Sequence, residues 1–311
     1  MFENRKQIYE FAKIANVPSC YSQKKLAKYV FYEENSASML KKLIYVGAIL
    51  LSAVCMMQTL EAKHRKVAVQ TYSLNRFTLE EAINKLKDMG LDGIECYPGQ
   101  KISNSMPDQK MGPDMSPEAK AFVKKMLKDA NLKIVSFGVT GADNEAQIRK
   151  LCEFAKEFGF DKILTESRVS TFEIWEKVGP EYGVKMCVHH HAMDSGNQYF
   201  DPDLVQKYTK DLKYVDANPD VGHWSRCGIN PVEALKKLKG NIGSVHFKDQ
   251  KKFGDKGNNC VPFGEGELNC KAMLAELDRQ GYNGFYVIEY EADWDNNVDK
   301  IRKCVEFLRK N

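Results

Sequence analysis

The sequence lacks the cysteine spacing of a zinc ribbon and the paired cysteines of a disulfide scaffold. Seven of its nine cysteines lie beyond residue 62, scattered along the chain and with no Cys-x-x-Cys pair among them. An odd number of scattered cysteines is typical of small buried apolar residues. Free thiols also fit poorly with export, because oxidising compartments favour their pairing.

A surplus of basic residues is also missing. The chain has 46 Lys and Arg against 42 Asp and Glu, and most of this small excess lies in the first 62 residues. A protein that binds nucleic acid usually gathers a basic excess into a patch. The charge balance therefore argues against a nucleic-acid partner.

The apolar run Leu43–Met57 is too short for a typical membrane span, which needs about 20 residues. It follows Lys41 and Lys42 and precedes Ala62, the charged, apolar and cleavable order of a secretory signal. We therefore predict a signal peptide in residues 39–62. A retained anchor and a buried helix are the alternatives.

This interpretation makes residues 1–38 an N-terminal extension that is not translated, with the start at Met39. An ordered amphipathic segment around residues 7–15 is the alternative. The processed protein would be periplasmic or secreted and would have no stable membrane span. It would be cytoplasmic if the apolar segment is not a signal.

The remaining residues, 63–311, have the length of one (β/α)₈ barrel. Short apolar runs alternate eight times with amphipathic segments, which predicts βα units and a parallel sheet. The predicted strands are Val67–Tyr72, Gly93–Cys96, Lys133–Gly138, Lys162–Thr165, Lys185–His189, Lys213–Ala217, Ile242–Phe247 and Phe285–Glu289. The predicted helices are Leu79–Met89, Pro117–Ala130, Glu145–Phe158, Phe172–Tyr182, Pro202–Lys210, Pro231–Leu238, Cys270–Gln280 and Val298–Leu308. The fold class is therefore α/β, a single TIM barrel.

Two long connections follow predicted strands, at residues 98–116 and 248–269. The carboxyl ends of the strands carry the active site in such barrels, so we expect these loops to cover a substrate. The alternative is that these are surface loops without a role in binding.

Chemically reactive residues gather at the carboxyl ends of the predicted strands. Five of the six histidines lie at or just past strands five to seven. Glu166, Asp220, His246 and Glu289 follow or end strands four, six, seven and eight, so their side chains should converge. Three carboxylates and one imidazole suit Mn²⁺ first, then Mg²⁺, with Co²⁺ or Zn²⁺ open. Isolated polar residues on the barrel rim are the alternative.

Asp220 and His223 are three residues apart, with Gly222 between them. We interpret this pattern as a metal ligand beside a histidine that faces the substrate. A local cap or turn is an equal alternative for the pattern by itself.

Four segments resemble the sugar phosphate isomerase/epimerase group of xylose isomerase-like TIM barrels. They are residues 220–226 (DVGHWSR), 244–249 (SVHFKD), 261–266 (VPFGEG) and 288–291 (IEYE). The resemblance implies a divalent metal held by Glu166, Asp220, His246 and Glu289. It further implies that the two glutamates act as acid and base on opposite faces of a sugar, with His223 on a substrate oxygen.

The chain departs from the group at two places. Val221 stands where the group usually has Thr, so a hydroxyl contact is absent. Many relatives have His-Asn-His where this chain has His189, His190 and His191. The additional imidazole could contact substrate or hold a second metal.

Catalysis of this kind removes a proton α to a carbonyl, and we predict Glu166 and Glu289 as the catalytic residues. Predicted substrate contacts are His189, His191, His223, Glu95, Trp224, Arg226 and Lys248. The alternatives are that Glu95 only closes the barrel rim, that Trp224 packs in the core, and that Arg226 and Lys248 are solvated surface residues. Tyr97 and Trp294 could stack on a sugar, and Glu291 could fix a neighbouring group.

The function predicted is a metal-dependent isomerase or epimerase of a keto-sugar or related polyol. A lyase or hydratase acting on an oxidised glycoside is the first alternative, because the same chemistry can lead to elimination. A DNA-repair endonuclease would need more histidines and a basic surface, and a sugar-binding barrel without catalysis would not need all four ligands. The expected partner is a small sugar, and homo-oligomerisation is left open.

Overall fold

The structure is a computed structural model that describes residue 46 and residues 64–193, 198–257 and 259–311. The predicted extension, start at Met39 and signal peptide therefore fall, apart from Val46, outside the described residues. Within the described part of the chain, no helix combines the length and the apolar character that crossing a membrane requires.

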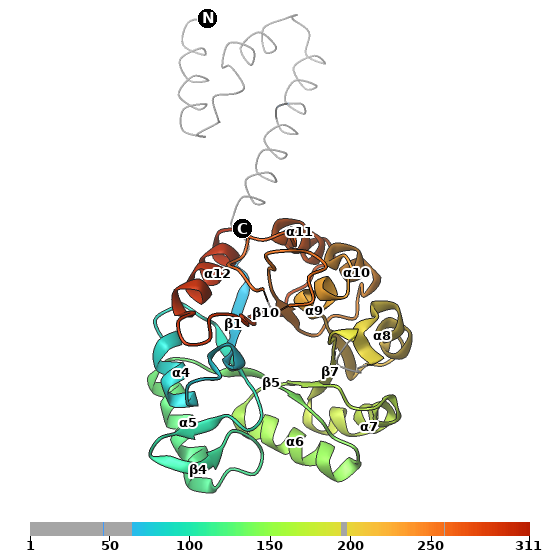
Figure 1. The fold of residues 1–311 in the computed structure, drawn as a ribbon. Helices are drawn as coiled ribbons and strands as arrows, with labels where there is room; N and C mark the ends of the chain where they lie inside the picture. The colour runs from blue at the N-terminus through green and yellow to red at the C-terminus, as the bar shows by residue number, and fades with distance from the viewer. Residues whose placement is uncertain (1–45, 47–63, 194–197, 258) are drawn as a thin grey trace, which may run out of the picture. The chain divides into compact units, whose positions relative to one another are not determined.

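Eight parallel strands form the sheet at the centre of residues 64–311 (Figure 1). They are β1 (Lys66–Gln70), β2 (Gly93–Cys96), β5 (Ile134–Thr140), β6 (Lys162–Thr165), β7 (Lys185–His189), β8 (Val215–Asn218), β9 (Val245–Phe247) and β10 (Phe285–Ile288). Their order is β8-β7-β6-β5-β2-β1-β10-β9. The edge strands β8 and β9 are joined by two parallel bridges, Ala217 to Ile242 and Asp220 to His246, so the barrel is nearly closed.

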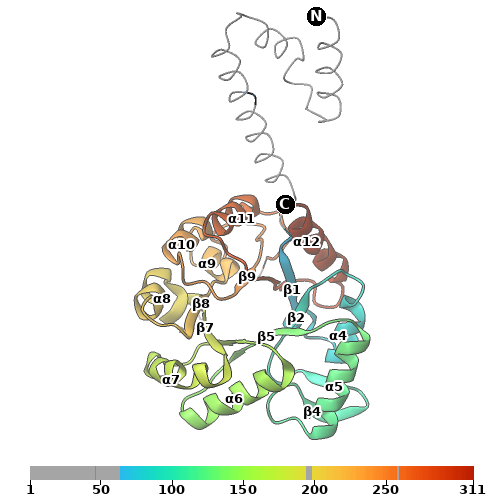
Figure 2. The same cartoon turned by 180° about the vertical axis from the view of Figure 1, so that it is seen from behind.

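Helices surround the strands, as the two opposite views show (Figures 1 and 2). They are α4 (Leu79–Leu86), α5 (Pro117–Asp129), α6 (Glu145–Phe158), α7 (Phe172–Tyr182), α8 (Pro202–Thr209), α9 (Val221–Arg226), α10 (Pro231–Lys237), α11 (Cys270–Arg279) and α12 (Val298–Lys310). All eight predicted strands and all eight predicted helices are present, with bounds that differ by three residues at most. Helix caps that are visible in the sequence explain the good match: Thr78 and Glu81, three residues apart, form a capping box at the start of α4.

The α-helix after β8 and a two-stranded hairpin were not predicted. The helix α9 replaces the loop expected after strand six, because the Asp220 side chain accepts a hydrogen bond from the His223 backbone N–H and caps a helix there. An antiparallel hairpin, β3 (Lys101–Ser103) and β4 (Met106–Lys110), lies within the first long connection. The mostly exposed residues of β4 give no apolar alternation from which a strand could be read.

Side-chain alternation along the strands separates two environments. Val67 and Val69 belong to the large core that the helices share, whereas Ala68 and Val287 pack together in a separate small cluster. Glu289 lies two residues beyond Val287, so it faces the same side of its strand. The interior therefore changes from apolar to polar toward the carboxyl ends of the strands.

Asp249 organises the long connection after β9. Its buried carboxylate accepts four backbone N–H groups, from Gln250, Gly264, Gly266 and Leu268, at 2.9–3.1 Å. Gly266 has to be a glycine, because a Cβ atom there would lie 2.4 Å from Asp249 Oδ1. One carboxylate thus holds the loop that follows His246 and Lys248.

We expect Asp249→Asn to destabilise the protein. Hydrogen bonds to a charged group contribute about 1.5–3 kcal/mol each, so weakening four of them should lower the free energy of unfolding by about 3 kcal/mol. Guanidinium chloride unfolding measures this loss, with the exposed Asp108→Asn as the matched control. Equal unfolding midpoints for the two variants would show that Asp249 does not hold the loop.

Candidate active site

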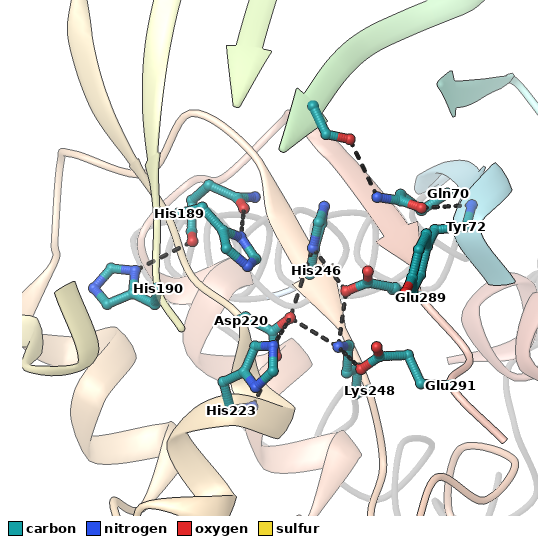
Figure 3. A network of polar contacts seen from close by, with 12 residues as sticks. Gln70, Tyr72, His189, His190, Asp220, His223, His246, Lys248, Glu289 and Glu291 are labelled. Carbon is teal, nitrogen blue, oxygen red and sulfur yellow. Dashed lines mark hydrogen bonds and ion pairs between the residues drawn. The ribbon is translucent and has the colours of Figure 1, made fainter. Parts of the chain in front are cut away.

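Asp220, His246 and Glu289 meet at the carboxyl ends of β8, β9 and β10 (Figure 3). The parallel bridge between Asp220 and His246 brings the first two together directly. One ligand atom from each residue, two carboxylate oxygens and an imidazole nitrogen, lies within 4.8 Å of the others. The first two residues are fully buried and Glu289 is nearly so.

Glu95 determines the orientation of His246. Its Oε1 lies 2.7 Å from His246 Nε2, and its Oε2 accepts a hydrogen bond of 2.5 Å from Ser136. A carboxylate can only accept here, so Nε2 carries a hydrogen and Nδ1 is directed at Asp220 and Glu289. Metal-binding histidines are commonly held by a carboxylate in this way. Glu95 is fully buried with both oxygens engaged, so it positions His246 and the predicted contact with substrate is wrong.

The three converging atoms fit a divalent cation. Asp220 Oδ2, His246 Nδ1 and Glu289 Oε2 are all buried, and the Lys248 ammonium lies against both oxygens. Three buried donor atoms that converge beside this balancing cation form a place that a divalent ion can occupy. Two carboxylates and an imidazole are donors that Mn²⁺, Mg²⁺ and Zn²⁺ all accept.

Lys248 supplies a positive charge at the same place. Its Nζ lies 2.9 Å from Asp220 Oδ2, 2.7 Å from Glu289 Oε2 and 2.6 Å from Glu291 Oε2 (Figure 3). The side chain is 1% exposed, and it passes against α9 at Gly222, where a Cβ atom would lie 2.6 Å from Lys248 Cδ. The glycine between Asp220 and His223 is therefore required for this close approach.

These contacts set the protonation of the cluster. Burial by itself would raise the pKa of Asp220 and Glu289, but the Lys248 ammonium and the neighbouring histidines together outweigh it and hold both pKa values below their usual range. Burial would lower the pKa of Lys248 and His246, but the surrounding carboxylates hold both well above their usual values. Asp220, Glu289, Lys248 and His246 are therefore all charged at neutral pH, and a metal ion bound at His246 Nδ1 would have to displace the proton there.

Three further histidines, His189, His191 and His223, lie beside the cluster of Asp220, His246 and Glu289. The ring centre of His189 lies 5.0 Å from that of His246, and His191 lies 4.2 Å from His223. Burial lowers the pKa of His189 and holds that of His223 well below its usual value. Both rings are therefore neutral at pH 7.

Arg226 determines which nitrogen of His223 carries the hydrogen. Its Nη1 lies 3.2 Å from His223 Nδ1, and its Nε donates to the backbone carbonyl of Lys256. Because a guanidinium only donates, Nδ1 accepts and the hydrogen of the neutral ring lies on Nε2. Arg226 thus orients a histidine, and its contact with substrate stays a prediction. The N–H at Nε2 also makes His223 a poor ligand for a second metal.

Trp224 is fully buried and packs edge-on against His190, with ring centres 4.7 Å apart. His190 in turn contacts the Asn218 carbonyl through Nδ1 and points away from the cluster (Figure 3). An indole without exposed surface cannot stack on a sugar, so the prediction that Trp224 binds substrate is wrong. The packing alternative is the one that the structure supports.

Glu166 follows β6 and is half buried. Its charge acts to raise the pKa of His189, so it lies on the same rim, but it is not among the three clustered ligand atoms. The structure therefore brings together three of the four predicted ligands, and the role of Glu166 stays a prediction.

Sequence reasoning missed Ser136 and Asn218. Ser136 contacts Glu95, and the side chain of Asn218 lies 2.8 Å from His189 Nδ1. Both are buried polar residues within strands, and a polar residue in an apolar run is the signal that could have found them. Their partners, however, are on other strands, so their roles could not be read from spacing.

Comparisons with known proteins agree with this geometry. Inosose dehydratase from Mesomycoplasma hyopneumoniae strain J is 22% identical over 285 residues, covering 75% of this chain and 88% of the relative. A solved structure from Parabacteroides distasonis is 28% identical with a TM-score of 0.64, covering 79% of this chain and 98% of that one. The 3-keto-D-glucoside 4-epimerase of E. coli has the same fold, with 18% identity, a TM-score of 0.60 and coverage of 79% and 100%.

Residues 83–311, well over half of the chain, match the family described as the xylose isomerase-like TIM barrel. The match includes Glu95 on β2 and the three clustered residues at the ends of β8 to β10. The chain therefore belongs to the xylose isomerase-like TIM barrel family.

Proposed function

We propose that the protein is a divalent-metal-dependent isomerase or epimerase that removes a proton α to the carbonyl of a keto-sugar or related polyol. The observation that carries this proposal is the convergence of Asp220, His246 and Glu289, each of which brings one buried ligand atom to the same place. A sugar phosphate isomerase/epimerase and two epimerases among the solved structures of this fold support it.

Asp220, His246 and Glu289 would hold the cation, and Glu166 is proposed as the fourth ligand from the same rim. Mn²⁺ is the ion that we propose first, because most of the donors are carboxylate oxygens. When bound, a divalent ion would polarise the substrate carbonyl and stabilise the negative charge that develops on its oxygen.

Glu289 is the proposed base. Its carboxylate is ionised at neutral pH, since Lys248 and His246 lower its pKa, so it can accept a proton from carbon. The Lys248 ammonium, 2.7 Å from it, adds positive charge beside the reacting atoms. His223, with its hydrogen on Nε2, is placed to donate to a substrate oxygen. The rings of His189 and His191 lie beside His223 on the same side of the site.

A lyase or hydratase is the second candidate. Of the two predicted catalytic residues, Glu289 belongs to the three-residue cluster and Glu166 does not. One base is enough for isomerisation or for elimination, whereas epimerisation with two bases needs a group on each face of the sugar. The inosose dehydratase relatives favour elimination on a cyclic ketone. Epimerisation needs Glu166 to reach the opposite face of the sugar.

The test is proton exchange in D₂O. Metal-loaded protein is incubated with candidate ketoses and oxidised glycosides, and deuterium at the carbon next to the carbonyl is followed by NMR. Deuterium incorporation supports proton abstraction, and the accumulating product separates isomerase or epimerase from lyase. No exchange with any of these substrates, in protein that binds them, would contradict the proposal.

Lys248→Met tests the charge balance of the cluster. Removing one partner of a buried ion pair costs about 3–5 kcal/mol, so the metal-free variant should melt well below the unaltered protein. Mn²⁺ should recover most of this loss, because it replaces the missing charge between Asp220 and Glu289. Differential scanning calorimetry with and without Mn²⁺ measures both effects, with the exposed Lys303→Met as control. A melting temperature that Mn²⁺ raises equally in both variants would contradict this assignment.

A further inference from the structure

Three aromatic side chains form a cluster beside the proposed active site. Tyr72 lies between Tyr97 and Trp294, with ring centres 5.1 and 5.8 Å apart and both pairs edge to face. Tyr72 is 38% exposed, and the residue after it, Ser73, contacts the residue after Glu289 through the Tyr290 N–H. The cluster therefore borders the site and is open to solvent.

Two of the three segments that carry this cluster, those of Tyr72 and Trp294, are joined by hydrogen bonds. Ser73 Oγ accepts the Tyr290 N–H at 2.8 Å, and the Ser73 carbonyl accepts the side-chain amide of Asn297 at 2.6 Å. Asn297 is fully buried, so these bonds are shielded from water. Tyr72 and Trp294 are thus held in a fixed relation before any ligand arrives, which lowers the entropic cost of binding.

A cavity of about 380 Å³ adjoins the cluster, and Trp294 and Glu291 are among its lining residues. Glu291 also contacts Lys248, which contacts Glu289, so two ion pairs link the lining of the cavity to the proposed base. Glu289 and Glu291 are two residues apart in the chain, so the cavity and the proposed base are neighbours.

The lining has the chemistry of a carbohydrate site. Trp294 offers an aromatic face, Val261 and Cys260 are apolar, and Asn259, Lys251 and Glu291 offer hydrogen-bonding groups. An aromatic surface with a few polar groups suits the apolar face and the hydroxyls of a sugar ring. The volume is at the small end of the range of about 300–1,000 Å³ for small-ligand pockets, so it fits one ring.

We propose that this cavity, with the cluster Tyr72, Tyr97 and Trp294, is a second subsite that holds the other ring of a glycoside whose keto-sugar ring lies at Glu289. The substrate is then a two-ring glycoside with an oxidised sugar, and a free monosaccharide fills only half of the site. The inference rests on the proposed function for the position of the first ring.

Tryptophan fluorescence reports on this subsite selectively. The chain has three tryptophans, and Trp175 and Trp224 are fully buried, so an emission change caused by a solute reports mainly on Trp294. Mn²⁺-loaded full-length protein is titrated with methyl β-D-glucoside as the one-ring probe. Cellobiose, maltose and trehalose are the two-ring probes.

We expect at least one disaccharide to change the emission and to bind about tenfold more tightly than the one-ring probe. Calorimetric titration of Trp294→Ala should show that this preference is lost, with one-ring affinity unchanged, and Trp294→Phe should retain part of it. Phe253→Ala, which removes an exposed aromatic elsewhere, is the control. Equal affinity for one-ring and two-ring probes, binding of neither, or an equal loss of both in Trp294→Ala would overturn the subsite.

The two proposals fail in different ways. Disaccharide preference without deuterium exchange on any oxidised sugar would overturn the proposed reaction and leave the subsite. Exchange on a keto-monosaccharide that is as fast as on the keto-disaccharide would overturn the subsite and leave the reaction.

Discussion

Glu289→Gln should abolish deuterium exchange at the carbon next to the substrate carbonyl. An amide cannot take the proton, and general base catalysis typically contributes about 10²–10⁴-fold to a rate. The substitution keeps the shape of the side chain, and Gln can still accept a hydrogen bond from Lys248, which lies 2.7 Å from the carboxylate. The measurement is the exchange rate in D₂O by NMR, with the melting temperature recorded to show that the variant is folded.

Glu265→Gln is the matched control for this variant. Glu265 is half exposed in the connection after β9 and pairs with Lys303, away from the three clustered ligand atoms. It should exchange at the rate of the unaltered protein. Exchange that survives in Glu289→Gln at a comparable rate would remove Glu289 from the role of base and leave Glu166 as the candidate.

Asp220→Asn should weaken divalent metal binding by about 100-fold or more. Changing residues that merely support metal ligands costs about 10–100-fold, and this substitution removes the charge of a ligand. Asn caps helices as well as Asp does, so α9 and the bond from the His223 backbone to the side chain should remain. Calorimetric titration with Mn²⁺ measures the affinity.

Asp203→Asn serves as the control because Asp203 is exposed at the start of α8 and pairs with Lys237. Its Mn²⁺ affinity should equal that of the unaltered protein. If Asp220→Asn bound Mn²⁺ as tightly as this control, the ion would be held elsewhere and the cluster would be an ion-pair network around Lys248.

The barrel could be predicted because its signals are local. Apolar runs and amphipathic segments alternate, and residues such as Thr78 and Ser116 begin helices with side-chain caps that spacing reveals. The helix α9 escaped prediction because Asp220 has two roles: one carboxylate oxygen caps the helix and the other faces the cluster. Spacing predicts a metal ligand and a local cap as alternatives for this pattern, whereas one aspartate has both contacts.

The site was predictable in its position and less so in its contacts. Strand ends of a parallel barrel meet at one rim, which is why Asp220, His246 and Glu289 could be expected together. That Glu95 binds His246, 151 positions further along the chain, depends on which strands face each other across the barrel. Burial likewise decided the role of Trp224, since a tryptophan after a strand can face either the ligand or the core.

The central claim is that Asp220, His246 and Glu289 share one divalent ion. Anomalous diffraction from a crystal soaked in Mn²⁺ tests it most directly, because the ion itself is then located. The account predicts one strong peak at about 2–2.5 Å from Asp220 Oδ2, His246 Nδ1 and Glu289 Oε2, with the Lys248 ammonium displaced from between the carboxylates. A map with no peak there, and Lys248 still bound to Asp220 and Glu289 at saturating Mn²⁺, would contradict it.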